Sequence, residues 1–156
     1  MSTLIVYFSW SGNTEKIAKK IEEKTGGELY RLERKVPYSE DYNTCAYVEA
    51  KEEIDKKIRP EIKQPLPDIN KYDKIILAFP IWWYTSPMPV WAFLESYPNW
   101  QGKKIYVFAN SYTDDPNYFT TSIEDAKKSA KDADIQPGLF NKDIANLDTW
   151  LKENGF

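Results

Sequence analysis

Hydrophobic residues form three short unbroken runs along the chain, at Leu4–Phe8, Ile75–Phe79 and Ile105–Ala109. Unbroken runs of this length are typical of parallel strands covered on both faces, because a strand with one wet face alternates apolar and polar residues. Two weaker segments, Glu28–Glu33 and Ala133–Leu139, mix charged with apolar residues or contain a proline and a glycine. Strands of that kind belong at sheet edges. The pattern therefore predicts three central strands and two edge strands.

Apolar residues at helical spacing fill the segments between these strands. Five helices are predicted, marked by Ile17, Ala18 and Ile21; by Tyr47, Ile54 and Ile58; by Val90–Tyr97; by Ile123, Ala126 and Ala130; and by Ile144, Leu147 and Leu151. We expect the first helix to end at Gly26-Gly27 and the second at Arg59, before Pro60. Thr121-Ser122-Ile123-Glu124 has the form of a capping box, which predicts that the fourth helix begins there. Alternating strands and helices predict a doubly wound α/β fold with right-handed crossovers.

The division into central and edge strands predicts a five-stranded parallel sheet of order 2-1-3-4-5. We expect helices on both faces of this sheet and a single domain spanning residues 1–156. In this order, ligands bind beyond the carboxyl ends of strands 1 and 3, where the winding direction changes. Three loops leave the central strands at that edge, and they are the candidate site: the first loop (Ser9–Thr14), the second loop (Pro80–Pro89) and the third loop (Asn110–Thr120).

The first loop has the residue types of an anion site. Backbone N–H groups at a helix N-terminus, together with the helix dipole, favour a phosphate. The hydroxyls of Ser9, Ser11 and Thr14 can donate further bonds, and Gly12 allows the backbone to approach the anion. An ordinary helix cap would use the same residue types, but the position after the first central strand favours phosphate. The GxxxxGK[ST] and GxGxxG patterns are both absent, so a terminal monophosphate fits best.

The second and third loops offer a site for a flat ring. Trp82, Trp83 and Tyr84 can form an aromatic wall, and we expect at least one of them to pack into the core instead. We favour Trp83 and Tyr84 over Trp82 as ring neighbours. The second loop has three prolines and no glycine, and a left-handed residue there would cost about 1–2 kcal/mol. In the third loop, Asn110, Ser111 and Tyr112 can bond the polar edge of a ring, whereas Asp114, Asp115 and Pro116 equally suit a polar turn.

The composition limits the function classes. Of the 156 residues, 42% are hydrophobic, which is typical of a globular protein, and the formal net charge is −3. A net negative charge argues against nucleic acid as the main partner, and no segment is apolar enough to span a membrane. Lys16, Lys19 and Lys20 are expected to be solvated on the outer face of their helix. A lone Cys45 and the absence of a targeting peptide before the first strand predict a cytoplasmic protein.

The chain contains no histidine. That excludes Ser-His-Asp and Cys-His catalysis and removes the residue most used for proton transfer near neutral pH. We expect no metal site and no catalytic side chain, so a bound cofactor would carry any chemistry. Cys45 is expected to be a buried or half-buried helix residue rather than a nucleophile.

The chain resembles the flavodoxin family. The resemblance is carried by the first loop behind Leu4–Phe8, and by Tyr38–Tyr42, Arg59-Pro60, Ala78–Trp83, Pro87, Pro89, Phe93-Leu94-Glu95, Gly102-Lys103 and Trp150-Leu151-Lys152. It implies a short-chain flavodoxin-like domain with FMN as cofactor, the phosphate on the first loop and the flavin ring between the other two. The cofactor-binding residues so implied are Ser9, Trp10, Ser11, Gly12, Asn13, Thr14, Pro80, Ile81, Trp82, Trp83, Tyr84, Asn110, Ser111 and Tyr112.

The resemblance favours an FMN electron carrier, whose partner would be a redox protein or a small-molecule electron acceptor. The alternative is an FMN-dependent oxidoreductase that passes electrons from NAD(P)H to a quinone or similar acceptor. Its second-substrate pocket would be walled by Tyr38–Asn43 and Asn110–Phe119. A phosphoacceptor signalling domain needs acidic residues to hold magnesium where this chain has Ser9 and Pro80, which excludes it. A purely structural module would show collapsed loops.

Overall fold

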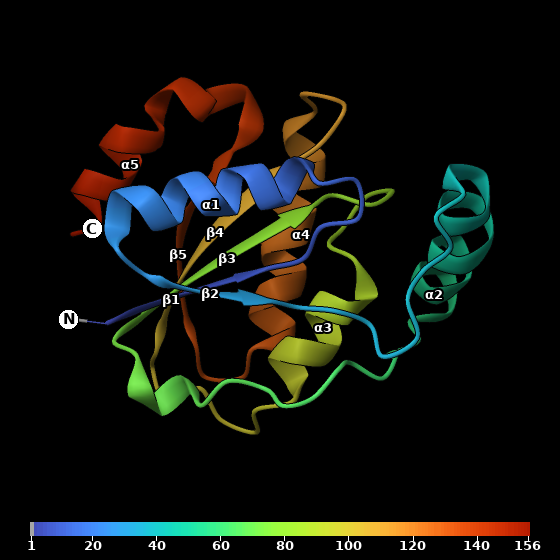
Figure 1. The fold of residues 1–156 in the computed structure, drawn as a ribbon, viewed down its shortest axis with the longest axis horizontal. Coiled ribbons are helices and arrows are strands. Elements are labelled where there is room, and N and C mark those ends of the chain that lie inside the picture. Colours follow the sequence, from blue (N-terminus) through green and yellow to red (C-terminus); the bar gives the residue numbers. More distant parts are fainter. Residues whose placement is uncertain (1) are drawn as a thin grey trace.

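A parallel sheet with helices on both faces forms the body of the protein (Figure 1). The structure is a computed structural model, and it describes residues 2–156. In chain order the elements are β1 (Thr3–Tyr7), α1 (Asn13–Thr25), β2 (Glu28–Arg31), the π-helix η1 (Thr44–Ala50), α2 (Lys51–Lys56), the 3-10 helix η2 (Ile69–Lys71), β3 (Lys74–Pro80), α3 (Met88–Glu95), β4 (Lys104–Asn110), α4 (Pro116–Ser129), β5 (Asp134–Phe140), the 3-10 helix η3 (Asn141–Asn146) and α5 (Leu147–Glu153).

The sheet has the order β2-β1-β3-β4-β5 with all neighbours parallel, which confirms the predicted topology. Successive residues of a strand point to opposite faces, and both faces are covered here. Leu77 and Phe79 pack with α3 and α4 on one face, whereas Ile76 and Ala78 pack with α1 and α5 on the other. Double coverage is the reason that the central strands are unbroken apolar runs.

The edge strand β5 contains the predicted irregularity. Its register against β4 shifts between Tyr106 and Phe108, opposite the Pro137-Gly138 pair. A Cβ atom on Gly138 would lie 2.7 Å from the Val107 carbonyl oxygen and 2.9 Å from Phe119 Cζ. Only glycine therefore allows β5 to pair with β4 beneath α4 at this point.

The start of α4 differs from the sequence prediction. The helix begins at Pro116 rather than at Thr121, and the Asp115 carboxylate accepts a hydrogen bond from the Asn117 N–H at 2.9 Å. Proline at the first helical position has a fixed φ and loses no hydrogen bond, so Asp115-Pro116 starts the helix one turn before the expected capping box. Ala126 and Ala130 are buried, as predicted.

The predicted inner face of the second helix is wrong at two of its three positions. Ile54 is buried, but Tyr47 is 58% exposed and Ile58 is 39% exposed. The segment Thr44–Ala50 is a π-helix, in which hydrogen bonds run from residue i to i+5. That spacing turns Cys45 and Ala50 inward instead of Tyr47.

The last helix is shorter than predicted. It starts at Leu147, and Leu147 and Leu151 are buried as expected. Ile144 lies before it in the 3-10 helix η3 and is 37% exposed. A 3-10 helix repeats every three residues rather than every 3.6, so Ile144 does not continue the apolar face of α5.

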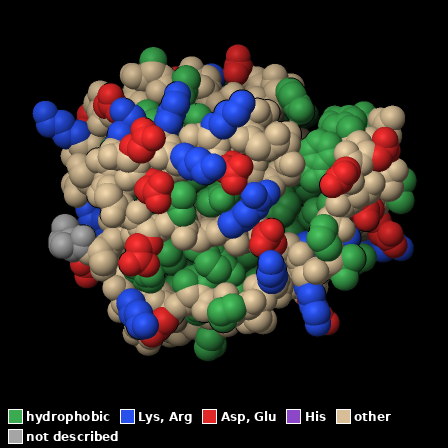
Figure 2. Space-filling view, in the orientation of Figure 1, with side chains coloured by type: hydrophobic (Ala, Val, Ile, Leu, Met, Phe, Trp, Pro, Cys, Tyr) green, Lys and Arg blue, Asp and Glu red, His purple; other side chains and the backbone are tan. Residues whose placement is uncertain are grey.

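Residues 36–58, which include η1 and α2, form a lobe that stands beside the layered body (Figure 1). Figure 2 shows hydrophobic side chains gathered where this lobe meets the rest of the molecule. Within residues 2–156, no helix has the length and hydropathy needed to cross a membrane.

Candidate functional site

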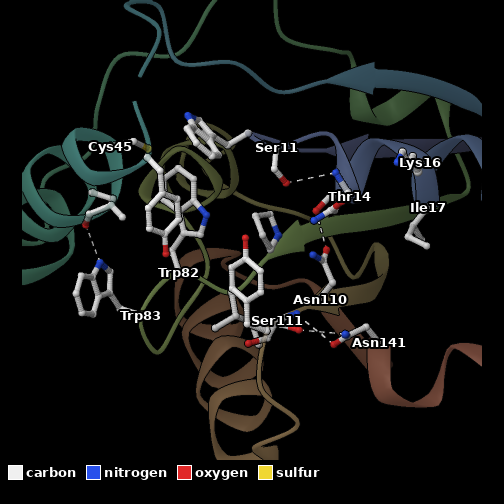
Figure 3. A pocket seen from close by; sticks show the side chains of 18 of the residues that line it. Ser11, Thr14, Lys16, Ile17, Cys45, Trp82, Trp83, Asn110, Ser111 and Asn141 are labelled. Carbon is white, nitrogen blue, oxygen red and sulfur yellow. Dashed lines mark hydrogen bonds between the residues drawn. The ribbon is translucent and has the colours of Figure 1, made fainter. Parts of the chain in front are cut away.

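A cavity of about 600 Å³ lies at the carboxyl ends of β1, β3 and β4 (Figure 3). The three predicted loops form its middle, and the lobe and the α1–η3 region form its two ends. Its lining residues are Trp10, Ser11, Asn13, Thr14, Lys16, Ile17, Lys20, Tyr42, Cys45, Ala46, Tyr47, Ala50, Pro80, Ile81, Trp82, Trp83, Asn110, Ser111, Tyr112, Asn141 and Ile144. The cavity has the size and the largely apolar lining of a small-molecule site.

The structure brings most of the implied cofactor-binding residues to this cavity. Those that line it are Trp10, Ser11, Asn13, Thr14, Pro80, Ile81, Trp82, Trp83, Asn110, Ser111 and Tyr112. Ser9, Gly12 and Tyr84 lie outside the lining. Ser9 and Gly12 belong to the interior of the first loop, and Tyr84 is at the tip of the second.

The first loop is shaped by its own side chains. Gly12 has φ of +96°, which favours glycine, although a Cβ there would meet no protein atom within 4 Å. The Gly12 N–H donates to Ser9 Oγ at 3.1 Å, and the Asn13 N–H points to Ser11 Oγ at 3.5 Å. Helix α1 begins directly after this turn, so its first N–H groups have no partner within the helix. The arrangement provides donors for an anion at the positive end of the helix dipole.

One hydrogen bond joins the first loop to the third. The buried Thr14 hydroxyl donates to Asn110 Oδ1 at 2.6 Å. Asn141, at the start of η3, then holds the third loop by two bonds, accepting from the Ser111 N–H and donating to the Ser111 carbonyl, each at 3.1 Å. The sequence reasoning missed Asn141, although it is a polar residue directly after the carboxyl end of β5.

The second loop makes a tight turn at its aromatic tip. The Trp82 N–H donates to the Thr85 carbonyl at 2.8 Å, and the Thr85 N–H donates back to the Trp82 carbonyl at 3.2 Å. Trp83, inside this turn, has φ of +62°, so the loop contains a left-handed residue despite having no glycine. Left-handed backbone in a bulky residue is strained. The turn is therefore held by its surroundings.

The three aromatic residues of the second loop point in different directions. Trp82 packs edge-on against Phe8 and Tyr38, with ring centroids 5.3 and 5.1 Å apart, so it is the aromatic that joins the core. Trp83 turns toward the lobe, where its indole N–H donates to the Ala46 carbonyl at 3.0 Å (Figure 3). Tyr84 lies outside the cavity, with Lys57 Nζ 5.4 Å from its ring centroid.

The lobe supplies a wall that the sequence reasoning largely missed. Tyr42, which lies in the proposed second-substrate wall Tyr38–Asn43, lines the cavity, and so do Cys45, Ala46, Tyr47 and Ala50. The π-helical winding of η1 brings these positions to the cavity, and the apolar pattern carries no signal for it. Cys45 is 3% exposed, and burial, with a contribution from Glu49, raises the pKa of its thiol to about 11. It therefore serves as a small apolar lining residue rather than a nucleophile.

Buried polar groups join the lobe to Arg34, in the segment that follows β2. The Tyr38 hydroxyl donates to one Glu53 carboxylate oxygen, and Arg34 Nη1 lies 3.0 Å from the other. The Arg34 guanidinium also covers the Tyr38 ring at 3.9 Å. Burial and the Glu53 hydrogen bond raise the pKa of Tyr38, and burial raises the pKa of Glu53 although Tyr38 and Arg34 act against it. Near neutral pH the Tyr38 phenol is therefore protonated and donates.

Lysines of α1 lie closer to the site than expected. Lys16 and Lys20, one turn apart, border the cavity with Ile17 between them, whereas Lys19 does not. Both lysines are exposed, as predicted, but they also border the cavity and so do not belong only to the outer face of α1. Among the described residues no Asp or Glu lines the cavity, so these two lysines are its charged lining residues. The same residues contain no cluster of three His, Cys, Asp or Glu side chains that could hold a metal.

The fold and the site define a flavodoxin-type α/β protein. Residues 2–154 match the family described as flavodoxin, and the chain belongs to that family. A flavoprotein of Lactobacillus acidophilus, whose crystal structure is a complex with FMN, is 26% identical, with a TM-score of 0.79 over 96% of this chain and 97% of that one. A protein of Bacteroides eggerthii is 29% identical, with a TM-score of 0.80 over 97% and 96% of the two chains.

More distant structures share the fold. The oxidised flavodoxin 2 of Bacillus cereus is 22% identical, with a TM-score of 0.60 over 96% of this chain and 94% of that one. None of the curated proteins matches this chain.

Proposed function

We propose that this protein binds FMN in the cavity and transfers electrons through it. The observation that carries the proposal is the position of the cavity, which brings the N-terminus of α1 together with the aromatic side chains of the second loop at the switch point of a flavodoxin-family sheet. The FMN complex of the Lactobacillus acidophilus relative, whose similarity extends over nearly the whole chain, supports it.

The residues present suit the two halves of FMN. The free N–H groups at the start of α1 and the Ser11 hydroxyl would hold the phosphate, and Lys16 and Lys20 would add positive charge nearby. Trp82, Asn110 and Ser111, which all line the cavity, would hold the ring. Trp82 replaces the favoured Trp83 and Tyr84 in this role, because Trp83 turns toward the lobe and Tyr84 lies outside the cavity. Bound FMN supplies reversible redox chemistry. The chain orients the ring, keeps water from its apolar part and ties the loops together through Thr14 and Asn110.

A second candidate is the FMN-dependent oxidoreductase that acts on quinones or similar acceptors. One observation favours it: the cavity extends beyond the three loops, to the lobe on one side and to η3 on the other. In either case the electron partner is a redox protein or a small molecule, and cytoplasmic location remains our prediction.

Calorimetric titration of the apoprotein with FMN and with riboflavin tests the assignment. We expect one FMN per chain and much weaker binding of riboflavin, because riboflavin has no phosphate for the first loop. Thr14→Val removes the hydrogen bond that orients Asn110 and should weaken FMN binding by about 0.5–1.5 kcal/mol, the range for a hydrogen bond between neutral groups. Equal affinity for FMN and riboflavin would exclude a phosphate-binding site on the first loop.

A further inference from the structure

Four aromatic rings form a row along the lobe end of the cavity, each in contact with the next. Trp10 contacts Tyr42 with ring centroids 6.0 Å apart, Tyr42 contacts Tyr47 at 6.3 Å, and Tyr47 contacts Trp83 at 5.4 Å. The interplanar angles are 61°, 80° and 80°, which is the edge-to-face arrangement. We call these four residues the aromatic wall. It runs from the first loop, across the lobe, to the second loop.

The aromatic wall is held in place by hydrogen bonds at both of its ends. The Trp10 indole N–H donates to the Ser39 carbonyl at 2.9 Å, and the Trp83 indole N–H donates to the Ala46 carbonyl at 3.0 Å. Between them, Tyr42 and Tyr47 remain 49% and 58% exposed. Exposed aromatic surface that is ordered in advance is typical of a binding site, because a ligand covers it without paying to order it.

Small residues leave space beside these rings. Cys45, Ala46 and Ala50 line the same end of the cavity, and Cys45 and Ala50 are buried. The i to i+5 spacing of the π-helix places these two small side chains together on its inner side. Rings at the rim and short side chains beneath them shape a recess for a flat molecule.

The charges around the recess limit the chemistry of that molecule. Within the described part of the chain, the cavity lining has no carboxylate, and its cations, Lys16 and Lys20, belong to the opposite end. A cationic ligand would therefore find no counter-charge, whereas a neutral or anionic one would meet no repulsion. A protein partner generally needs an interface of more than about 1,000 Å², and this recess is a small concave feature.

We propose that the aromatic wall, with its floor of Cys45, Ala46 and Ala50, is a subsite for a planar, neutral or anionic aromatic electron acceptor of the quinone class. The inference rests on the proposed FMN function and gives it a substrate. A quinone that takes two electrons and two protons from reduced flavin leaves as the hydroquinone. A nicotinamide nucleotide, giving a hydride with one proton from water, restores the reduced flavin, so the overall reaction balances.

Binding without turnover tests the subsite. FMN-loaded protein, with its flavin content measured, is titrated in air with 1,4-naphthoquinone-2-sulfonate and no reductant, by calorimetry and tryptophan fluorescence. We expect saturable binding at one site per chain and a shift of the flavin absorption band. Tyr47→Ala should weaken quinone binding at least tenfold and leave FMN bound, whereas Tyr47→Phe, which keeps the ring, should bind as the parent does.

Val48→Ala is the matched control. Val48 is 60% exposed on the same π-helix, next to Tyr47, and does not line the cavity. Its variant should bind the quinone as the parent does. Loaded parent protein that shows no saturable quinone binding would overturn the subsite and point to a protein partner. Equal binding by Tyr47→Ala and Val48→Ala would also overturn it, and failure to load FMN would overturn the proposed function itself.

Discussion

The sheet and the lobe are stabilised by different interactions. The central strands are buried on both faces by apolar side chains, and Ile76, Leu77 and Phe79 are all 0% exposed. The lobe has a smaller apolar contact, in which Ile54 packs with Met88 and Trp91, and it depends more on a few directed bonds, chiefly the Arg34–Glu53 ion pair and the two indole N–H donors of the aromatic wall. Apolar burial has no preferred direction, so it persists when one apolar side chain replaces another of similar size. A hydrogen bond or ion pair is lost when its donor or acceptor atom is removed or displaced.

The fold therefore depends mainly on burial in the sheet, and the shape of the cavity depends mainly on the bonds that hold the lobe. Loss of a side chain from the sheet should destabilise the whole molecule, because both helical layers pack against it. Loss of a lobe anchor should loosen one end of the cavity while the sheet remains folded.

Truncation in the sheet should have the largest effect. Phe79→Ala removes a fully buried ring from β3 and should lower the free energy of unfolding by about 3–5 kcal/mol. Urea denaturation, followed by circular dichroism, measures this change. A loss below about 1 kcal/mol would mean that the sheet is not the main source of stability.

Loss of the lobe anchor should have a smaller and more local effect. Glu53→Ala leaves Arg34 and the Tyr38 hydroxyl without their partner and should cost about 1.5–3 kcal/mol, less than a fully buried pair because Arg34 retains some solvent. Hydrogen exchange should accelerate at residues 44–56 and remain slow in β3.

Glu52→Ala provides the control for this anchor. Glu52 is on the same helix and makes only an exposed ion pair with Lys56, so its loss should cost below about 0.5 kcal/mol. If exchange in β3 accelerated as much as exchange in the lobe after Glu53→Ala, the two regions would unfold as one unit.

Alkaline pH should destabilise the protein through buried tyrosines. The pKa of Tyr38 is raised in the folded state by burial and by Glu53, so the unfolded chain loses this proton first as the pH rises. Stability is therefore complete below pH about 10 and falls above it, by at most about 1.4 kcal/mol per pH unit for one group. Tyr38→Phe should reduce that slope between pH 10 and 11.5, as measured by urea midpoints. An unchanged slope would show that Tyr38 keeps an ordinary pKa.

The strained turn of the second loop should show the smallest effect. Trp83→Gly and Trp83→Ala both remove the indole, but only glycine accepts φ of +62° without strain. After the entropy cost of glycine in the unfolded chain, Trp83→Gly should be more stable than Trp83→Ala by about 0.5–1 kcal/mol. Thermal unfolding of the two variants measures the difference, and a more stable alanine variant would show that the turn relaxes once the indole is lost.

The same contrast explains what could be predicted from the sequence. The strand order followed from apolar runs because every residue of a doubly covered strand is buried, and the first loop was evident because Gly12 and the hydroxyl residues are local signals. The lobe end of the cavity was not predictable in this way. Its winding is π-helical, which displaced Tyr47 from the expected inner face.

The start of α4 and the position of Lys16 and Lys20 could not be predicted from local sequence patterns. Asp115-Pro116 and the Thr121–Glu124 box both suit a helix start, and the earlier signal prevails because nothing stops the helix between them. Lys16 and Lys20 border the cavity because η3 and the third loop fold toward α1, an arrangement that no local pattern encodes.

Native mass spectrometry of the purified protein shows whether the cavity holds FMN. We expect a mass excess equal to one FMN per chain, either as isolated or after incubation with FMN, and acid extraction should release FMN itself. If the protein carried no flavin and took up none from excess FMN, while its circular dichroism showed it to be folded, it would not be an FMN protein.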